Sequence, residues 1–141
     1  MSATYKELKD RLTDFGFEED DVAESDYKRI YVNSFNQAGA IINNAVIRNI
    51  EGYIRKDEEL DDDEDISTIT RITEDTADTD YIYYPDVVDP LFPLLAAHYA
   101  WLDDDLTKAT IYWNEYDDLK DQIIAMATRP RKVTFVGGVD L

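Results

Sequence analysis

The sequence predicts a mainly α-helical fold, a bundle of about four helices that includes one long central helix. Apolar residues recur every three or four positions in four separate segments, which is typical of helices with one buried face. An acidic stretch rich in Ile, Thr and Tyr interrupts these segments and predicts a small β-hairpin or strand insertion. We expect one helical domain over residues 1–128, with the insertion at 57–84, and a strand-like C-terminal docking arm at 129–141.

Two helices are predicted in the first part of the chain. The first covers residues 3–15 and ends at Gly16, and its apolar face comprises Tyr5, Leu8, Leu12 and Phe15. Ser25 or Asp26 is placed to cap the second helix. This helix, over residues 27–56, is the predicted spine of the bundle, and its apolar stripe comprises Tyr31, Phe35, Ala38, Ile42, Ala45, Val46, Ile50 and Tyr53.

The insertion and two further helices follow. Two short strands are expected at about 66–73 and 80–84, forming a hairpin or an ordered excursion between helices. The third helix, over residues 87–102, is apolar on every side and is therefore predicted to be buried. The fourth helix covers residues 105–128 and should lie antiparallel to the third, because the connection is short. Its apolar face comprises Ala109, Tyr112, Tyr116, Leu119, Ile123 and Met126.

Acidic residues dominate the composition, and they are unevenly placed. The chain holds 32 Asp and Glu against 14 Lys and Arg, a formal charge of -18. Residues 57–107 carry seventeen of the acids and a single base, Arg71. This charge excludes a broad basic surface for nucleic acid, because phosphates would be repelled. We also expect no membrane contact, since the longest uncharged apolar run is too short to span a bilayer.

Catalysis and cofactor binding find little support in the sequence. The chain has no cysteine, which excludes disulfides and thiolate sites. Its one histidine, His98, lies in an apolar segment, where we expect a core or interface histidine bonded to a tyrosine. An EF-hand loop that starts at Asp61 would place Ile66 and Ile72 where glycine and glutamate are needed. We therefore predict a protein that is not an enzyme and that holds no metal and no cofactor.

The last thirteen residues differ in character from the rest of the chain. Three bases precede a short apolar, strand-like run, and the predicted docking residues are Arg129, Arg131, Lys132, Val133, Phe135 and Val136. Such a strand can pair with the chain's own hairpin, or it can add to the exposed sheet edge of a partner. The sequence leaves both alternatives open.

One segment resembles a known family. In residues 83–120, an entry at Tyr84–Asp86 leads to the apolar helix Leu94–Tyr99, then to a break at Trp101–Asp105 and to a helix that carries Tyr112–Lys120. This order of motifs resembles the small head–tail connector proteins, or adaptors, of tailed bacteriophages. The resemblance extends over about residues 27–128.

The resemblance implies a structural protein of the virion, located at the head–tail interface and assembled in the host cytoplasm. Such connectors are helical bundles that form a ring beneath the portal protein, usually with twelve copies, and their C-terminal segment reaches the portal or the next connector or tail component. DNA passes through the ring without specific binding. An acidic channel would suit this role because it repels phosphate, and the candidate channel-facing acids are Asp57, Glu58, Glu59, Asp61, Asp62, Asp63, Asp103, Asp104 and Asp105.

A second reading belongs to a different class of protein. The density of negative charge is also typical of an acidic DNA mimic, which occupies the DNA site of a nuclease or repressor. The basic, strand-like end of the chain and the all-apolar third helix speak against this reading. It stays as the alternative.

Overall fold

The computed structural model describes residues 2–17, 24–61, 63–64 and 69–128, and this part of the chain is mainly helical. Five α-helices and a two-stranded antiparallel sheet make up the described fold, which confirms the predicted fold class. The helices are α1 (Tyr5–Asp14), α2 (Glu24–Ala45), α3 (Glu51–Asp57), α4 (Leu91–Trp101) and α5 (Leu106–Thr128), and the strands are β1 (Ser2–Thr4) and β2 (Tyr81–Tyr83).

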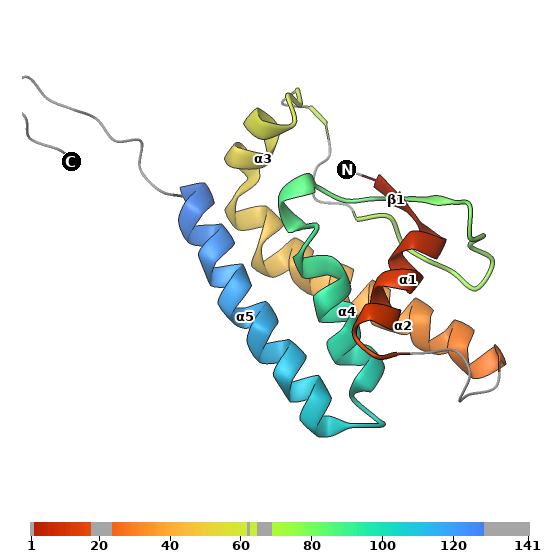
Figure 1. The fold of residues 1–141 in the computed structure, drawn as a ribbon. Coiled ribbons are helices and arrows are strands. Elements are labelled where there is room, and N and C mark those ends of the chain that lie inside the picture. The colour runs from red at the N-terminus through yellow and green to blue at the C-terminus, as the bar shows by residue number, and fades with distance from the viewer. Residues whose placement is uncertain (1, 18–23, 62, 65–68, 129–141) are drawn as a thin grey trace, which may run out of the picture.

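Helix α4 is the centre of the bundle. It packs against α2 on one side and α5 on another, and α1 crosses it as well (Figure 1). Eight of its eleven residues are buried, as expected for a helix that is apolar all round. Helices α4 and α5 run antiparallel through a short turn, which confirms the predicted pairing (Figure 1).

The seam between α2 and α4 is built from aromatic and small residues. The rings of Phe35 and Phe92 meet edge to face, with their centroids 5.5 Å apart, and the centroid of the Tyr84 ring lies 5.2 Å from that of Phe92. Gly39 on α2 brings the backbone close to Phe92 and Ile69. The predicted apolar stripe of this helix is buried at Tyr31, Phe35, Ala38 and Ile42.

The predicted helix over residues 27–56 is interrupted. The central helix α2 begins earlier, at Glu24, and ends at Ala45, and the chain continues through the 3-10 helix η2 (Ile47–Asn49) into α3. The side-chain amide of Asn49 donates to the carbonyl of Ala45 at 2.7 Å, the acceptor that its backbone N–H would use in a continuing helix. That N–H donates to Val46 instead. A local side-chain hydrogen bond therefore accompanies the interruption.

One strand of the predicted hairpin is present as β2, but it pairs with a different segment from the one predicted. Strand β2 pairs with β1 at the N-terminus, in the register Ser2–Tyr83, Ala3–Ile82 and Thr4–Tyr81. Residues 69–73 form no strand, and residues 66–68 lie outside the described part of the chain. Thr70 still runs beside β2, because its N–H donates to the carbonyl of Tyr83 at 3.1 Å and its hydroxyl accepts from the Tyr83 N–H at 3.0 Å.

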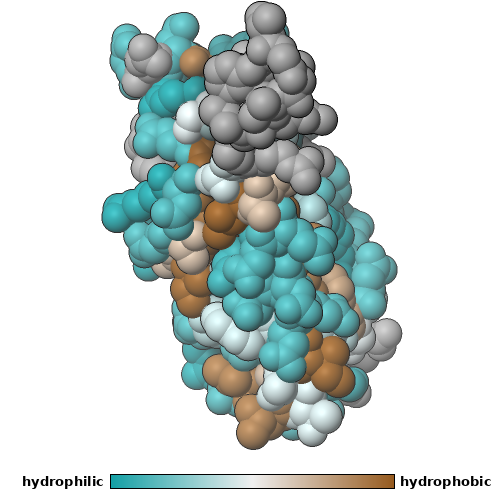
Figure 2. All heavy atoms as spheres, turned by 90° about the vertical axis from the view of Figure 1, so that its left-hand side faces the viewer, coloured by the Kyte–Doolittle hydropathy of each residue, from teal (hydrophilic) through white to brown (hydrophobic). Residues whose placement is uncertain are grey.

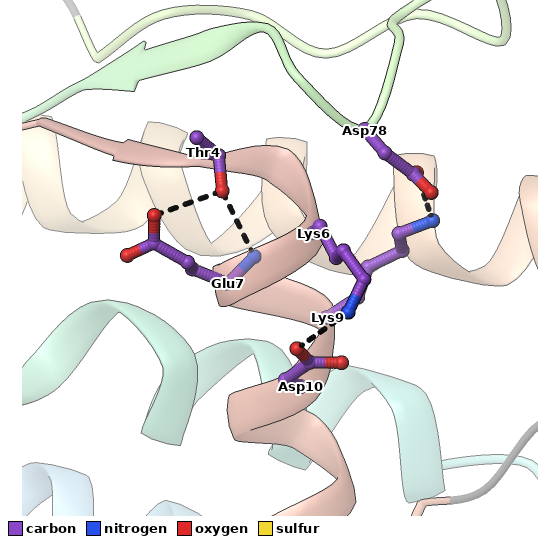
Figure 3. Close-up of polar contacts among 6 residues, drawn as sticks. All are labelled: Thr4, Lys6, Glu7, Lys9, Asp10 and Asp78. Atoms are coloured by element: carbon purple, nitrogen blue, oxygen red, sulfur yellow. Dashed lines mark hydrogen bonds and ion pairs between the residues drawn. The ribbon is translucent and has the colours of Figure 1, made fainter.

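The first helix starts later than predicted because Thr4 caps it. The Thr4 hydroxyl accepts from the Glu7 N–H at 3.2 Å and donates to the Glu7 carboxylate at 3.0 Å, which places residues 2–4 outside the helix (Figure 3). The helix ends at Asp14, and Gly16 follows with φ +82°, a conformation that favours glycine.

A loop from residues 73–80 is held against the start of α1. The carbonyls of Asp80 and Asp78 accept from the N–H groups of Tyr5 and Lys6, at 2.9 and 3.1 Å. The Lys9 ammonium reaches the Asp78 carboxylate at 2.6 Å (Figure 3). This hydrogen bond lowers the pKa of Asp78 below its ordinary value. The loop thereby satisfies backbone donors that a helix start leaves open.

Candidate functional site

The two predicted acidic segments lie at opposite ends of the bundle. Residues 57–64 follow α3 at one end, and residues 103–105 form the turn between α4 and α5 at the other (Figure 1). A single copy therefore presents two separate acidic surfaces.

The segment after α3 is organised around Arg55. Its guanidinium contacts the Glu51 carboxylate at 3.0 Å, the carbonyl of Glu64 at 2.7 Å and the carbonyl of Asp61. Glu59 takes φ 55°, a left-handed conformation that ends the helix. Glu58 is half-buried, and its carboxylate accepts from the Asp86 N–H at 3.2 Å.

The structure thus divides the acids that were predicted to face a channel. Glu58 holds the η3 segment (Asp86–Val88) through a backbone hydrogen bond, which gives it a role within the fold. Asp62 lies outside the described residues. The remaining acids of this segment have exposed side chains, and they are Asp57, Glu59, Asp61 and Asp63.

The turn between α4 and α5 combines acids with apolar side chains. Asp103 and Asp104 are exposed, whereas Asp105 accepts from the Lys108 N–H at 3.1 Å and caps α5. Leu102 and Leu106 on either side are 41% and 68% exposed. The turn therefore exposes two leucines beside two acids.

The predicted docking arm at 129–141 lies outside the described residues, and so do its candidates Arg129, Arg131, Lys132, Val133, Phe135 and Val136. The arm begins directly after Thr128, where α5 ends. This point lies at the same end of the bundle as α3 (Figure 1). The first acidic segment and the start of the arm therefore share one end of the molecule.

His98 is part of the seam between α4 and α5. Its Nδ1 donates to the carbonyl of Ala109 at 2.7 Å, and its ring lies 5.2 Å from that of Trp113. The expected bond to a tyrosine is wrong, although the Tyr99 ring packs against His98 at 4.9 Å. The imidazole thus ties α4 to α5 through the backbone carbonyl of Ala109.

The remaining chemistry of the described residues is limited. Within residues 2–17, 24–61, 63–64 and 69–128, no three His, Asp or Glu side chains come together as a possible metal site. No helix in this part of the chain is long and apolar enough to cross a membrane. That the protein is not an enzyme stays a prediction.

A polar groove on α2 was not anticipated from the sequence. It has a volume of about 340 Å³, and its lining includes Arg29, Asn33, Gln37, Arg71 and Glu74. Beside it, the Asn36 side chain donates to the carbonyl of Ile72 and accepts from its N–H, at 2.8 and 2.9 Å. One sequence signal could have found this face, because residues 27–50 contain three bases and no acid in a chain of charge -18.

Comparison with known proteins adds no relative to this picture. No family model matches the chain, and no curated protein or solved structure does. The resemblance to phage connectors therefore depends on the motifs of residues 83–120.

Proposed function

We propose that the protein is a structural component of the phage neck. Copies of the chain form a ring that joins the portal protein to the next connector or tail component, and DNA passes through the ring. This proposal rests on the resemblance of residues 83–120 and on one observation of the structure. Acids crowd both ends of the bundle, while residues 27–50, which include most of α2, contain none.

This distribution of charge suits lateral assembly. Copies that each carry a charge of -18 repel one another, so faces that meet in a ring must keep like charges apart. The outward face of α2 presents the exposed amides of Asn33, Gln37 and Asn44, and Arg48 is exposed in η2 just after the helix. A face of this kind permits side-by-side contact between acidic copies.

The acidic ends have a separate role in the proposal. The exposed acids of residues 57–64 or of residues 103–104 face the channel and repel the DNA backbone. No bound state then delays DNA during packaging or ejection. The arm at 129–141 docks on the portal or on the tail-side neighbour, because its bases and its strand-like run suit an acidic sheet edge.

Copy number in purified particles tests this function. The measurement is quantitative mass spectrometry of virions of the source phage, against a labelled standard and with the portal protein counted in the same sample. About a dozen copies per particle, in constant ratio to the portal, support a neck component. Absence from particles together with abundance in infected cells contradicts it, and competition with DNA for a basic protein would then test the mimic.

Removal of residues 129–141 tests the docking arm separately. The shortened chain should keep its helical content and its melting temperature, because the described core lies within residues 2–128. It should no longer be incorporated into particles. Unchanged incorporation would rule out the arm as the docking element and leave the ring to be tested by copy number.

A further inference from the structure

The outward face of α5 carries a continuous exposed stripe. Its members recur every three or four residues and are therefore neighbours on one side of the helix: Ile111, Glu115, Asp118, Gln122 and Met126. Ile111 and Met126 are 49% and 47% exposed, although Met126 was predicted to face the core. The buried face of α5, with Ala109, Tyr116 and Ile123, points the other way.

Figure 2 views the side of the molecule on which α5 lies. Hydrophilic side chains cover most of this face, and hydrophobic ones occupy small separate areas among them (Figure 2). Within the stripe, Glu115 and Asp118 make the middle acidic, and Ile111 and Met126 make the two ends apolar. Such a surface does not suit a membrane or a purely apolar partner, but it suits a polar groove that offers positive charge and some apolar contact.

The groove on α2 has these properties. Arg29 and Arg71 line it with the exposed amides of Asn33 and Gln37, and Val32 and Ala40 contribute apolar surface. Glu74 is the one acid among the residues that line the groove, against two arginines. Arg71 is also the only base in residues 57–107, so the one positive side chain of that acidic region lies at this groove.

The groove and the stripe are two different surfaces of each copy. The buried face of α2, with Phe35 and Ala38, packs towards α4, and the groove residues lie on the other side of the helix. Helix α5 packs on α4 in the same manner and turns its stripe outward. Complementary surfaces at two different places on one chain produce head-to-tail contacts, which close into rings when the rotation allows.

We propose that the acidic stripe of α5 in one copy docks into the Arg29–Arg71 groove on α2 of the next copy. This inference rests on the proposed ring and names its lateral interface. Glu115 and Asp118 face the two arginines, and Ile111 or Met126 contacts Val32 and Ala40. The contact places opposite charges together and keeps the acidic ends of neighbouring copies out of the interface.

Chemical cross-linking tests the interface, because the chain has no cysteine of its own. The full-length Gln37→Cys/Gln122→Cys variant carries one thiol in the groove and one in the stripe. Treated at high protein concentration with a short bis-maleimide, it should give a ladder of covalent oligomers. The matched control is Gln37→Cys/Thr13→Cys, whose second thiol lies at an exposed position on α1. A ladder no stronger than that of the control overturns the proposal.

Charge reversal in the cross-linkable chain adds a second measurement. Glu115→Lys/Asp118→Lys should reduce the ladder to the control level, and so should Arg71→Glu. An equal mixture of the two variants should restore the ladder, because each then meets a partner of opposite charge. Asp103→Lys/Asp104→Lys makes the same change in net charge outside the stripe and should leave the ladder intact. Failure of the mixture to restore the ladder contradicts the assigned charge pairing.

The two tests separate this interface from the proposed function. A dozen copies per particle without a ladder above control would keep the neck function and reject this interface. A strong ladder from a protein absent from particles would keep the interface and reject the neck function. Circular dichroism of every variant shows whether the chain is still folded.

Discussion

Helices α4 and α5 are joined by a short turn, yet they meet opposite environments. Eight of the eleven residues of α4 are buried, because α2 and α5 cover it from two sides. Only Ala109, Tyr116 and Ile123 are buried in the 23 residues of α5. Helix α4 therefore contributes most of its surface to the core of the bundle, whereas α5 leaves a long face exposed.

The two seams of α4 also differ in chemistry. The α2–α4 seam is apolar, with Phe35 against Phe92. The α4–α5 seam includes the polar groups of His98 and Tyr116, and the buried Tyr116 hydroxyl has no hydrogen-bond partner. An unpaired buried hydroxyl costs stability. The α4–α5 seam is therefore expected to be the weaker of the two.

The largest expected effect comes from truncating the α2–α4 seam. Phe92→Ala should lower the free energy of unfolding by about 3–5 kcal/mol, because a fully buried ring is replaced by a cavity. Ile111→Ala on the outer face of α5 should change it by less than about 0.5 kcal/mol. Urea denaturation of both variants measures the difference. Similar losses in the two variants would contradict the expectation that α4 contributes more to stability than the outer face of α5 does.

Alkaline pH should weaken the α4–α5 seam through the ionisation of Tyr116. Burial raises the pKa of Tyr116 from 10.0 to about 12. Below pH 10.0 the tyrosine is neutral in both states, and its contribution is complete. As the pH rises from 10.0 towards 12, the unfolded chain loses the phenol proton while the folded chain keeps it, so stability falls, by on the order of 2–3 kcal/mol.

Tyr116→Phe is the matched control for this effect. Four other described tyrosines also have a raised pKa, so the wild-type chain loses further stability through Tyr83, Tyr84, Tyr99 and Tyr112. The Phe variant should be at least as stable as the wild type near neutral pH and should lose less between pH 10.0 and 12. Urea denaturation across this range provides the test. Equal losses in the two chains would show that Tyr116 ionises like an exposed tyrosine.

A smaller, stabilising effect is expected from an alanine at Gly39 in the α2–α4 seam. A Cβ added at Gly39 would lie 3.6 Å from Ile69 and 3.8 Å from Phe92, which are ordinary contact distances. Gly39→Ala should therefore raise the free energy of unfolding by up to about 1 kcal/mol, because alanine favours the helix more than glycine does. Gly52→Ala on α3 measures the effect of helix propensity alone, because a Cβ added there has no neighbouring atom within 4 Å. A clear loss at Gly39 with a gain at Gly52 would indicate that the seam is tighter than this structure has it.

The smallest effect is expected far from both seams, at the loop beside α1. The Lys9–Asp78 contact lowers the pKa of Asp78, so it stabilises the fold above the ordinary value of 3.8 and is lost as the pH falls below it. Because Asp78 is exposed, Asp78→Asn should cost less than about 1 kcal/mol near neutral pH. The same variant should make hydrogen exchange of the Tyr5 and Lys6 amides faster. Unchanged exchange would show that the backbone bonds alone hold the loop.

The helices were largely predictable from the sequence, and the contacts between distant segments were not. The periodic apolar residues of α1, α4 and α5 predicted these helices to within a few residues, because helix formation depends on neighbours along the chain. The interruption at Ala45 escaped prediction, since the apolar stripe continues through Val46 and Ile50 and only the Asn49 side chain marks the change.

Candidate surfaces show the same limit. The acidic segments were predicted as charge runs, but Glu58 and Asp105 turned out to hold local structure through backbone hydrogen bonds. The groove was missed because Arg29 and Arg71 lie 42 positions apart in the sequence and meet only after folding. The absence of acids from residues 27–50 was the one signal that pointed to it.

By itself, the sequence determined the helical class, the burial of α4 and the concentration of acids, because these follow from composition and short-range periodicity. Only the tertiary structure decided that β2 pairs with β1 and not with residues 69–73. It also brought Arg29 and Arg71 together at the groove and left the stripe of α5 exposed. The physical reason is that a strand edge or a charged side chain pairs with whatever packing brings within reach, and periodicity along the chain carries no information about that choice.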